Sequence, residues 1–317
     1  MPDNDLFPKE IILEVTNHCN LRCRHCHFHA RKELRRRELG HMDSSIWKKV
    51  LEELKGLNRP VTLMTHGAGE PLLYKHIFKL LEEAKMNPLL SVGFMCNGML
   101  LDKSSVDRLI DLQVDFIAFS VDGVNPETHD HFRINADLKR IEENINYLVD
   151  RKRKVNSPVP ALHFNMVGYP EILDQSMDYV RKWLPESAAL SIATFRPIGS
   201  RKLWNQEPGP DFKPCPLLWN QMVVTHDGRA GLCCEDINVD VSPGSVDRTG
   251  LGEIFNHSSK LNYYREKHME GGLEGLRLCS DCHSWAGDMT LEEKDLIIDG
   301  MRIRKRTTPA FTTYTRL

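Results

Sequence analysis

The chain has 317 residues, with 42 Lys or Arg and 44 Asp or Glu, so its formal net charge is −2. This balance gives the chain no overall attraction to nucleic acid or to an anionic membrane surface. The sequence has no apolar run of about 18 residues and no apolar signal-peptide core after its acidic N-terminus, so it predicts a cytoplasmic protein that neither spans a membrane nor binds nucleic acid.

Short apolar runs alternate with longer helical patterns up to about residue 200. The apolar runs occupy 11–15, 61–65, 89–95, 115–120, 162–167 and 190–194. Helical periodicity appears between them in 44–57, 74–85, 104–112, 138–152 and 171–183. Because the apolar runs are continuous, we expect strands buried on both faces of a parallel sheet. Six such repeats predict an α/β fold with right-handed crossovers, and the pattern alone does not separate a partial barrel from an open sheet.

The sequence changes character after about residue 200. A linker is marked by Pro197, Gly199, Pro208, Gly209, Pro210 and Pro214. Asp227-Gly228, between the short runs 220–226 and 229–234, is a strong hairpin signal. A helical stretch over 251–269 follows, and the tail is predicted to form a terminal helix with a loose end. We therefore predict three parts, with boundaries at 1–200, 201–288 and 289–317.

The chain contains nine cysteines, and eight of them fall into two groups. A cytoplasmic compartment keeps thiols reduced, so the clustering favours metal ligation over disulfides. Cys96 stands alone in a predicted strand, where a small buried thiol is expected to pack.

The first group is the C-x3-C-x2-C triplet of Cys19, Cys23 and Cys26, directly after the first apolar run. Three thiolates on one loop can hold three irons of a cubane cluster and leave the fourth iron open. A structural zinc ion usually has four protein ligands. Zinc stays an alternative because nearby histidines can complete its ligand set: His18, His25, His27 and His29.

These residues resemble the radical S-adenosylmethionine (radical SAM) superfamily, whose signature is C-x3-C-x-aromatic-C, with His25 in the aromatic place. The resemblance implies a partial (β/α)6 barrel and a 4Fe-4S cluster on Cys19, Cys23 and Cys26. It also implies SAM bound to the open iron, with His25 against the adenine. An external electron donor such as flavodoxin or ferredoxin then drives the release of a 5′-deoxyadenosyl radical.

The second predicted strand runs into His66-Gly67-Ala68-Gly69-Glu70-Pro71. Ligands of parallel β/α folds bind at such strand ends, where glycines permit close backbone approach and a carboxylate accepts hydrogen bonds from an ammonium. By itself the segment is equally a plain turn. The resembled family carries G-G-E-P here to hold the methionyl amino group, which implies that Gly67, Gly69 and Glu70 bind SAM, although Ala68 replaces the usual glycine.

Two further strand ends resemble positions where the family contacts the SAM ribose and carboxylate. They imply roles in SAM binding for Asn97, Ser120 and Asp122. Arg133 matches a position where the family often places an arginine, and its guanidinium can pair with a carboxylate. An exposed arginine beside a helix is the alternative for Arg133.

The second cysteine group contains Cys215, Cys233, Cys279 and Cys282, with Cys234 beside Cys233 as its fifth member. Four thiolates can close the coordination of an iron–sulfur cluster, and the distal C-x2-C also fits zinc. With Cys215-Pro216 before it and Asp227-Gly228 within it, this part resembles the single-auxiliary-cluster form of the SPASM/twitch radical SAM enzymes. The resemblance covers about residues 10–285 and is strongest to the branch that holds the butirosin aminocyclitol dehydrogenase and the neomycin epimerase.

Cys233 and Cys234 are adjacent, so on a strand only one of the two can face the cluster. The resemblance makes Cys233 the ligand and leaves Cys234 to face the substrate. The weak S–H bond of Cys234 can then give a hydrogen atom to a substrate radical and invert that carbon. The alternatives are that Cys234 packs, or that Cys234 is the ligand and Cys233 packs.

Two basic runs, 31–37 and 151–154, have no interleaved aromatic residues, so we expect solvated faces rather than a nucleic-acid site.

Together these features predict a radical SAM enzyme that takes a hydrogen atom from a carbon of a polar small molecule. The resemblance favours an amino sugar or aminocyclitol, and a ribosomal peptide is second because the short N-terminus leaves little room for a leader-binding domain. Epimerisation with Cys234 as donor is the favoured outcome. Dehydrogenation with the auxiliary cluster as electron acceptor is the alternative, and a zinc scaffold without catalysis is the rival from another class.

Overall fold

The computed structural model describes residues 6–204 and 212–317. The predicted linker residues Pro208, Gly209 and Pro210 lie outside the described residues.

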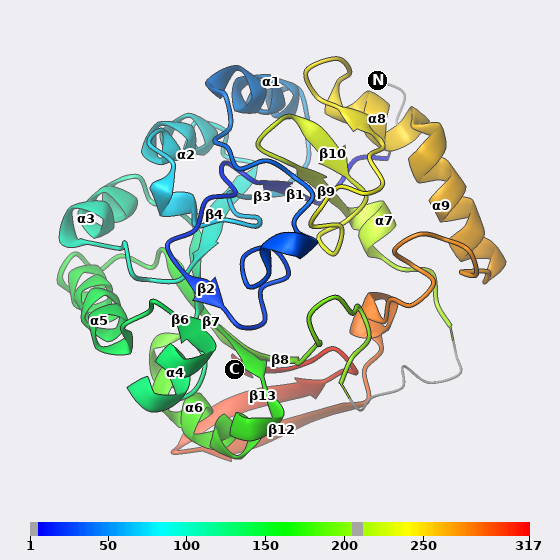
Figure 1. Ribbon diagram of the computed structural model, residues 1–317. Helices are drawn as coiled ribbons and strands as arrows, with labels where there is room; N and C mark the ends of the chain where they lie inside the picture. Colours follow the sequence, from blue (N-terminus) through cyan, green and yellow to red (C-terminus); the bar gives the residue numbers. More distant parts are fainter. Residues whose placement is uncertain (1–5, 205–211) are drawn as a thin grey trace.

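Six parallel strands form the centre of one large sheet and curve around the molecule as a partial barrel (Figure 1). Their order is β1-β3-β4-β5-β7-β8, with parallel pairing at every step. The strands are β1 (Glu10–Leu13), β3 (Val61–Met64), β4 (Leu90–Cys96), β5 (Phe116–Ser120), β7 (Ala161–Gly168) and β8 (Ala189–Thr194). Each overlaps a predicted strand, so the predicted α/β partial barrel is confirmed.

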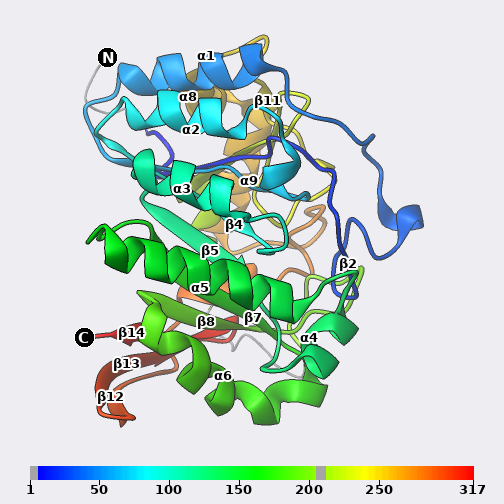
Figure 2. The same ribbon diagram turned by 90° about the vertical axis from the view of Figure 1, so that its left-hand side faces the viewer.

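Helices cover the outer face of these strands, as Figures 1 and 2 show from two sides. They are α1 (Ser44–Lys55), α2 (Ile77–Lys85), α3 (Lys103–Asp111), α4 (Pro126–Phe132), α5 (Leu138–Lys154) and α6 (Ser176–Trp183). Short 3-10 helices lie at Lys32–Leu34, Pro71–Leu73, Pro170–Gln175 and Leu184–Glu186. Helix α1 buries Trp47, Val50 and Leu54, which recur at helical spacing along one face.

The predicted hairpin is present and extends the barrel sheet. Strands β9 (Gln221–Val224) and β10 (Arg229–Gly231) pair antiparallel, and β9 pairs in parallel with β1. Gly228 has a φ of 83°, which the turn requires and which glycine adopts without strain. Strand β11 (Gly244–Ser245) pairs with β10, and α7 (Leu217–Asn220) precedes the hairpin.

The helix predicted over 251–269 is two helices, α8 (Leu251–His257) and α9 (Ser259–Glu270). Ser258 lies between them in an extended conformation, and its side chain accepts a hydrogen bond from the Leu261 N–H. A serine oxygen at this position satisfies an amide that otherwise has no partner at a helix start. This cap explains the break that the apolar periodicity did not reveal.

The prediction of a terminal helix in the tail is wrong. A 3-10 helix (Ser284–Asp288) leads into three antiparallel strands, β12 (Glu292–Ile298), β13 (Met301–Thr307) and β14 (Phe311–Arg316). Asp299 and Gly300 both have positive φ and form the tight turn between β12 and β13. Strand β14 pairs antiparallel with β8, so the tail closes onto the barrel edge.

The resulting sheet has 12 strands in the order β11-β10-β9-β1-β3-β4-β5-β7-β8-β14-β13-β12. It runs across both predicted part boundaries, at 200 and at 288, and the three-part division stays a proposal. Among the described residues, no helix is both long and apolar enough to cross a membrane.

We predict that Ile303→Ala lowers the free energy of unfolding by about 2–5 kcal/mol. Ile303 in β13 is fully buried, so the shortened side chain leaves a cavity. Thermal and denaturant unfolding measure the change, with Arg302→Ala, an exposed neighbour on the same strand, as the matched control. Equal, small effects of both substitutions would show that the tail does not pack as described.

Candidate active site

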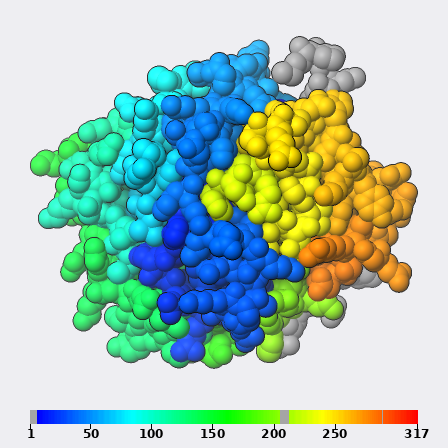
Figure 3. Space-filling view, turned by 45° about the horizontal axis from the view of Figure 1, so that its top comes forward, coloured from blue at the N-terminus to red at the C-terminus, as the bar shows by residue number. Residues whose placement is uncertain are grey.

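The loop with the first cysteine group follows β1 and lies across the carboxyl ends of the barrel strands (Figure 1). Part of it, β2 (Arg22–Cys23), pairs with β6 (Arg133–Ile134) in a separate two-stranded sheet. In the space-filling view the N-terminal segment, in blue, lies against the yellow segment that contains the hairpin (Figure 3).

The thiols of Cys19, Cys23 and Cys26 lie together on this loop. The N–H of Leu21 donates to Cys19 Sγ at 3.4 Å, and the N–H of His29 donates to Cys26 Sγ at 3.2 Å. Burial raises the pKa of Cys19 to about 12 and that of Cys23 to about 11, and the charge of Cys26 adds to both shifts. Three crowded thiolates therefore need a nearby cation, and the irons of a cluster fit this donor set.

Glu70 lies next to this loop, buried, at the tip that follows β3. Its carboxylate accepts hydrogen bonds from the N–H of Asn97 at 2.9 Å and the N–H of Leu72 at 3.3 Å. Burial raises the pKa of Glu70 to about 7. No Lys, Arg or His forms an ion pair with it within residues 6–204 and 212–317, so its carboxylate is free to receive an ammonium group.

Gly69 permits the tip to touch the cysteine loop. A Cβ at Gly69 would lie 2.5 Å from the carbonyl oxygens of Thr16 and His18. The neighbouring Glu70 N–H donates to the His18 carbonyl at 2.8 Å. A side chain at position 69 is therefore incompatible with this backbone contact.

Asn97 and Ser120 lie at the ends of their strands, as predicted. Asn97 is buried, and its Nδ2 donates to Asn20 Oδ1 of the cysteine loop at 2.8 Å. Ser120 is half-buried at the end of β5. Cys96 is buried in the sheet, which agrees with a packing role.

Asp122 and Arg133 form a buried ion pair, with 2.8 Å between Asp122 Oδ2 and Arg133 Nε. Asp122 also accepts from the Val167 N–H at 2.8 Å, whereas Arg133 Nη1 donates to Cys23 Sγ at 3.8 Å. The alternative of an exposed Arg133 is wrong. Asp122 is fully buried and positions Arg133, and its predicted contact with SAM stays a prediction.

His25 lines two cavities, and its Nδ1 hydrogen-bonds to the Tyr169 hydroxyl. Burial, followed by the charge of Arg133, lowers the pKa of His25 to about 4. The ring is therefore neutral at pH 7 and offers a flat surface without a charge.

Arg37 is not a solvated residue of the basic run, because it is buried against Glu14. The two guanidinium nitrogens lie 2.5 and 2.7 Å from the carboxylate oxygens. Glu14 also accepts from the Ala68 N–H at 3.0 Å and contacts His226 Nδ1 at 3.3 Å. A Cβ on Gly67 would lie 2.6 Å from Glu14 side-chain atoms, so this glycine is explained by the ion pair. The only sequence signal for this ion pair was Glu14 itself, a glutamate inside the first apolar run.

Burial alone would raise the pKa of Glu14, but hydrogen bonds from Arg37 and His226 and the charge of Arg37 outweigh it and hold the pKa below 4.5. The ionised pair therefore contributes stability at neutral pH, which is lost as pH falls through the lowered pKa.

The second cysteine group surrounds one cavity. Cys215, Cys233, Cys279 and Cys282 line it together with His268 and Trp285. Burial raises the pKa of Cys279 to about 12, with the charges of Cys282 and Cys215 adding to the shift. Crowded thiolates here again need nearby cations, so the irons of a cluster fit this donor set as they fit the first group. Over the described ranges, no three His, Cys, Asp or Glu side chains form a group able to hold a single metal ion.

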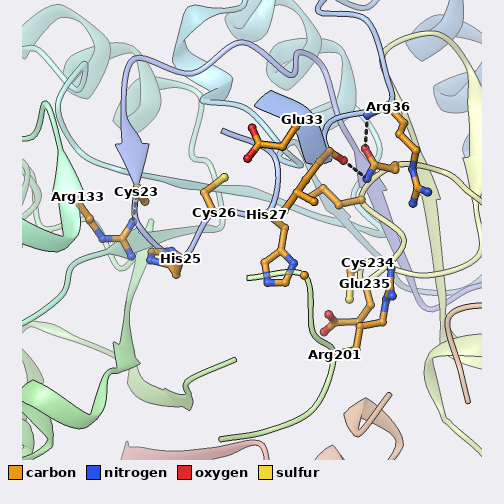
Figure 4. Close-up of a pocket in the computed structure, with 14 residues that line it drawn as sticks. Cys23, His25, Cys26, His27, Glu33, Arg36, Arg133, Arg201, Cys234 and Glu235 are labelled. Atoms are coloured by element: carbon orange, nitrogen blue, oxygen red, sulfur yellow. Dashed lines mark hydrogen bonds between the residues drawn. The ribbon is translucent and has the colours of Figure 1, made fainter. Parts of the chain in front are cut away.

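Cys234 faces two other cavities, of about 500 and 460 Å³. His25, His27 and Glu235 line both, and Glu235 also borders the four-cysteine cavity. Cys234 is therefore exposed in the walls of these cavities. In the view of Figure 4, Arg133, His25 and Cys26 lie on one side and Cys234, Glu235 and Arg201 on the other. Burial, then the charges of Glu235 and Glu10, raises the pKa of the Cys234 thiol.

Two arginines beside these cavities were missed by the sequence analysis. Arg196 pairs with Glu235, which also accepts from the Ser284 hydroxyl at 3.0 Å. Arg201 lines the larger cavity, and its buried Nε has no hydrogen-bond partner among the residues that the structure describes. Both follow the last barrel strand, Arg196 directly before the predicted linker and Arg201 within it, where proline and glycine were the only clear signals.

Family models match two parts of the chain. Residues 13–184 match the model of the radical SAM superfamily, and residues 215–283 match that of an iron-sulfur cluster-binding domain.

Curated relatives match over part of their length. A tungsten-containing aldehyde ferredoxin oxidoreductase cofactor-modifying protein of Pyrococcus furiosus is 28% identical over 222 residues, which are 69% of this chain and 61% of the relative. An AdoMet-dependent heme synthase of Methanosarcina barkeri is 31% identical over 126 residues, 40% of this chain and 34% of the relative. The chain thus spans less than two thirds of the length of either relative.

Solved structures share the fold. BtrN in complex with AdoMet and 2-DOIA has a TM-score of 0.61 at 20% identity, covering 88% of this chain and 94% of that chain. SuiB of Streptococcus suis bound to S-adenosylmethionine has a TM-score of 0.65 at 16% identity, and the match covers 82% of this chain and 68% of that chain. At these identities the likeness shows the fold alone.

We predict that Glu14→Gln lowers the free energy of unfolding by about 3–5 kcal/mol at pH 7, because it leaves the Arg37 charge buried without its partner. Below about pH 4.5 the difference from the unsubstituted protein shrinks, since the carboxylate then becomes protonated. Denaturant unfolding across pH measures both effects. Glu52→Gln, in an exposed pair with Lys55, is the control and changes stability little. A pH-independent difference would contradict the prediction.

We predict that Gly69→Ala lowers iron from about eight to about four per chain after anaerobic reconstitution, because the new Cβ displaces the cysteine loop. Gly272→Ala is the matched control, since a Cβ there meets no atom of the described residues within 4 Å. Full iron loading of Gly69→Ala would show that the loop tolerates the displacement.

Proposed function

This chain belongs to the radical SAM superfamily, and we propose that it inverts a carbon of a small polar substrate by removing one hydrogen atom and returning another from Cys234. Its radical SAM domain implies SAM and a 4Fe-4S cluster, and its iron-sulfur cluster-binding domain implies auxiliary iron–sulfur ligation. When bound and reduced by a donor of the flavodoxin or ferredoxin class, the cluster and SAM supply a 5′-deoxyadenosyl radical that abstracts the hydrogen atom.

The residues of the loop and strand tips support this assignment. Cys19, Cys23 and Cys26 would hold the SAM-bound cluster. Glu70, buried and without a basic partner among the described residues, suits the amino group of SAM. The neutral His25 ring suits the uncharged adenine. We propose a single auxiliary cluster on Cys215, Cys233, Cys279 and Cys282.

One observation carries the proposed reaction: adjacent cysteines face different cavities. Cys233 lines the four-cysteine cavity, whereas Cys234 lines the two cavities that also contain His25 and His27 of the cysteine loop. A substrate held there lies between the loop that would hold the SAM-bound cluster and the Cys234 thiol. This arrangement favours removal of hydrogen from one face and delivery to the other.

A C–H bond of the substrate breaks on one face, and its hydrogen atom leaves on 5′-deoxyadenosine. The S–H bond of Cys234 then breaks, and a new C–H bond forms on the opposite face. The Cys234 sulfur radical regains one electron from the flavodoxin- or ferredoxin-class donor and one proton from solvent.

Dehydrogenation is the second candidate reaction, and the position of Glu235 supports it. Because Glu235 borders all three cavities, the four-cysteine site lies beside the proposed substrate space. An auxiliary cluster held by Cys215, Cys233, Cys279 and Cys282 would then supply an electron acceptor beside a substrate radical that has lost a proton.

The cavity volumes favour a small molecule over a folded partner. The likeness to BtrN, solved with 2-DOIA, supports an amino sugar or aminocyclitol. A ribosomal peptide is second, supported by the likeness to SuiB bound to precursor peptide SuiA. The Arg201 Nε, which has no hydrogen-bond partner among the described residues, favours a substrate with a hydroxyl or carboxylate acceptor near Cys234.

We predict that Cys234→Ser lowers epimer formation by about a hundredfold or more, because a serine O–H bond is too strong to give its hydrogen atom to a carbon radical. The reconstituted holoenzyme is assayed with a panel of amino sugars and aminocyclitols in deuterium oxide, by mass spectrometry and NMR. Unsubstituted enzyme should place one solvent deuterium at the inverted carbon.

Cys96→Ala, which removes a buried thiol that faces none of these cavities, is the matched control. The variant must retain its iron and still form 5′-deoxyadenosine. An unaltered epimerisation rate in Cys234→Ser excludes the thiol as donor, and an oxidised product without deuterium favours dehydrogenation.

A further inference from the structure

His268 lies on α9 and lines the cavity of Cys215, Cys233, Cys279 and Cys282. Its side chain is 2% exposed, and the Phe212 ring packs beside it with ring centroids 5.9 Å apart. No sequence motif indicates a role for this residue, and no step of the proposed reaction uses it.

The hydrogen bonds of the ring define its tautomer. The backbone N–H of Cys215 donates to His268 Nδ1 at 3.2 Å, so Nδ1 is an acceptor and carries no proton. In a neutral imidazole the proton is then on Nε2, which makes Nε2 a donor.

That donor has no acceptor within the described chain. His268 Nε2 is buried without a hydrogen-bond partner, and no other side chain that lines this cavity has such an unsatisfied atom. Buried N–H groups are nearly always paired, so the unpaired Nε2 indicates an acceptor that belongs in the cavity. The sulfurs of a cluster held by four thiolates are acceptors of this kind.

We propose that His268 donates its Nε2–H to a sulfur of the auxiliary cluster and raises the reduction potential of that cluster. A hydrogen bond to sulfur stabilises the reduced cluster, which carries one more negative charge, more than the oxidised one. His268 is thus a positioning and tuning residue that makes the cluster a better electron acceptor. The inference rests on the auxiliary cluster of the proposed function.

Because Nδ1 contacts the backbone of Cys215, the same ring links one cluster ligand to the cluster sulfur. His268→Leu removes both contacts. His268→Gln keeps an acceptor for the Cys215 N–H and a donor for the cavity, so it serves as the conservative variant.

The test is a redox titration of the reconstituted holoenzyme followed by electron paramagnetic resonance, with iron counted in each variant. His268→Leu should lower the midpoint potential of the auxiliary cluster and leave that of the SAM-bound cluster unchanged. His268→Gln should restore most of the shift. His257→Leu, an exposed histidine on α8, is the control and should change neither potential.

A second measurement needs no variant. In protein labelled with 15N-histidine, the reduced auxiliary cluster should show a nitrogen coupling and an exchangeable proton coupling in pulsed resonance spectra. An unchanged potential in fully loaded His268→Leu, or the absence of both couplings, overturns the inference alone. If the unsubstituted enzyme instead holds only about four irons per chain, it has no auxiliary cluster. That result overturns the proposed function as well.

Discussion

The buried ion pair of Glu14 and Arg37 is the constraint that joins the first cysteine loop to the tip after β3 and to the hairpin that leads to Cys233. A buried carboxylate is stable only when its oxygens are satisfied, and here the partners come from the cysteine loop, the tip after β3 and the hairpin turn. These segments must therefore fold against one another together. The lack of a side chain at Gly40, where a Cβ would lie 2.6 Å from the His226 ring, belongs to the same arrangement.

In the segment after β10, consecutive residues line different cavities. Cys233 borders the four-cysteine cavity, Cys234 borders the proposed substrate cavities, and Glu235 lies between them. The Arg196 guanidinium fixes the Glu235 carboxylate at this boundary. In the proposed function, this short stretch of backbone would keep the Cys234 donor beside, but apart from, an auxiliary cluster on Cys233, and the substrate radical would react with whichever of the two it reaches first.

Local patterns predicted the barrel well, because continuous apolar runs and the Asp227-Gly228 turn act over a few residues. Contacts between distant segments were not predictable in the same way. Arg37 looked like part of a solvated basic run until the fold placed Glu14 beside it, and no local pattern predicted the ion pair between Asp122 and Arg133. The tail strands were missed although Asp299-Gly300 and the alternating Arg302-Ile303-Arg304 carried a local signal, because the basic composition obscured the alternation.

The pairing of β14 with β8 has a consequence for how the chain matures. Both strands contribute to one cavity wall, through Ala193 and Phe311, yet the entire four-cysteine part lies between them in the sequence. During synthesis β8 emerges long before β14, and its edge is open to wrong partners throughout that interval. Cys215 through Cys282 leave the ribosome during this interval. The four cysteines therefore need iron at the same time as the open edge of β8 carries its risk of aggregation.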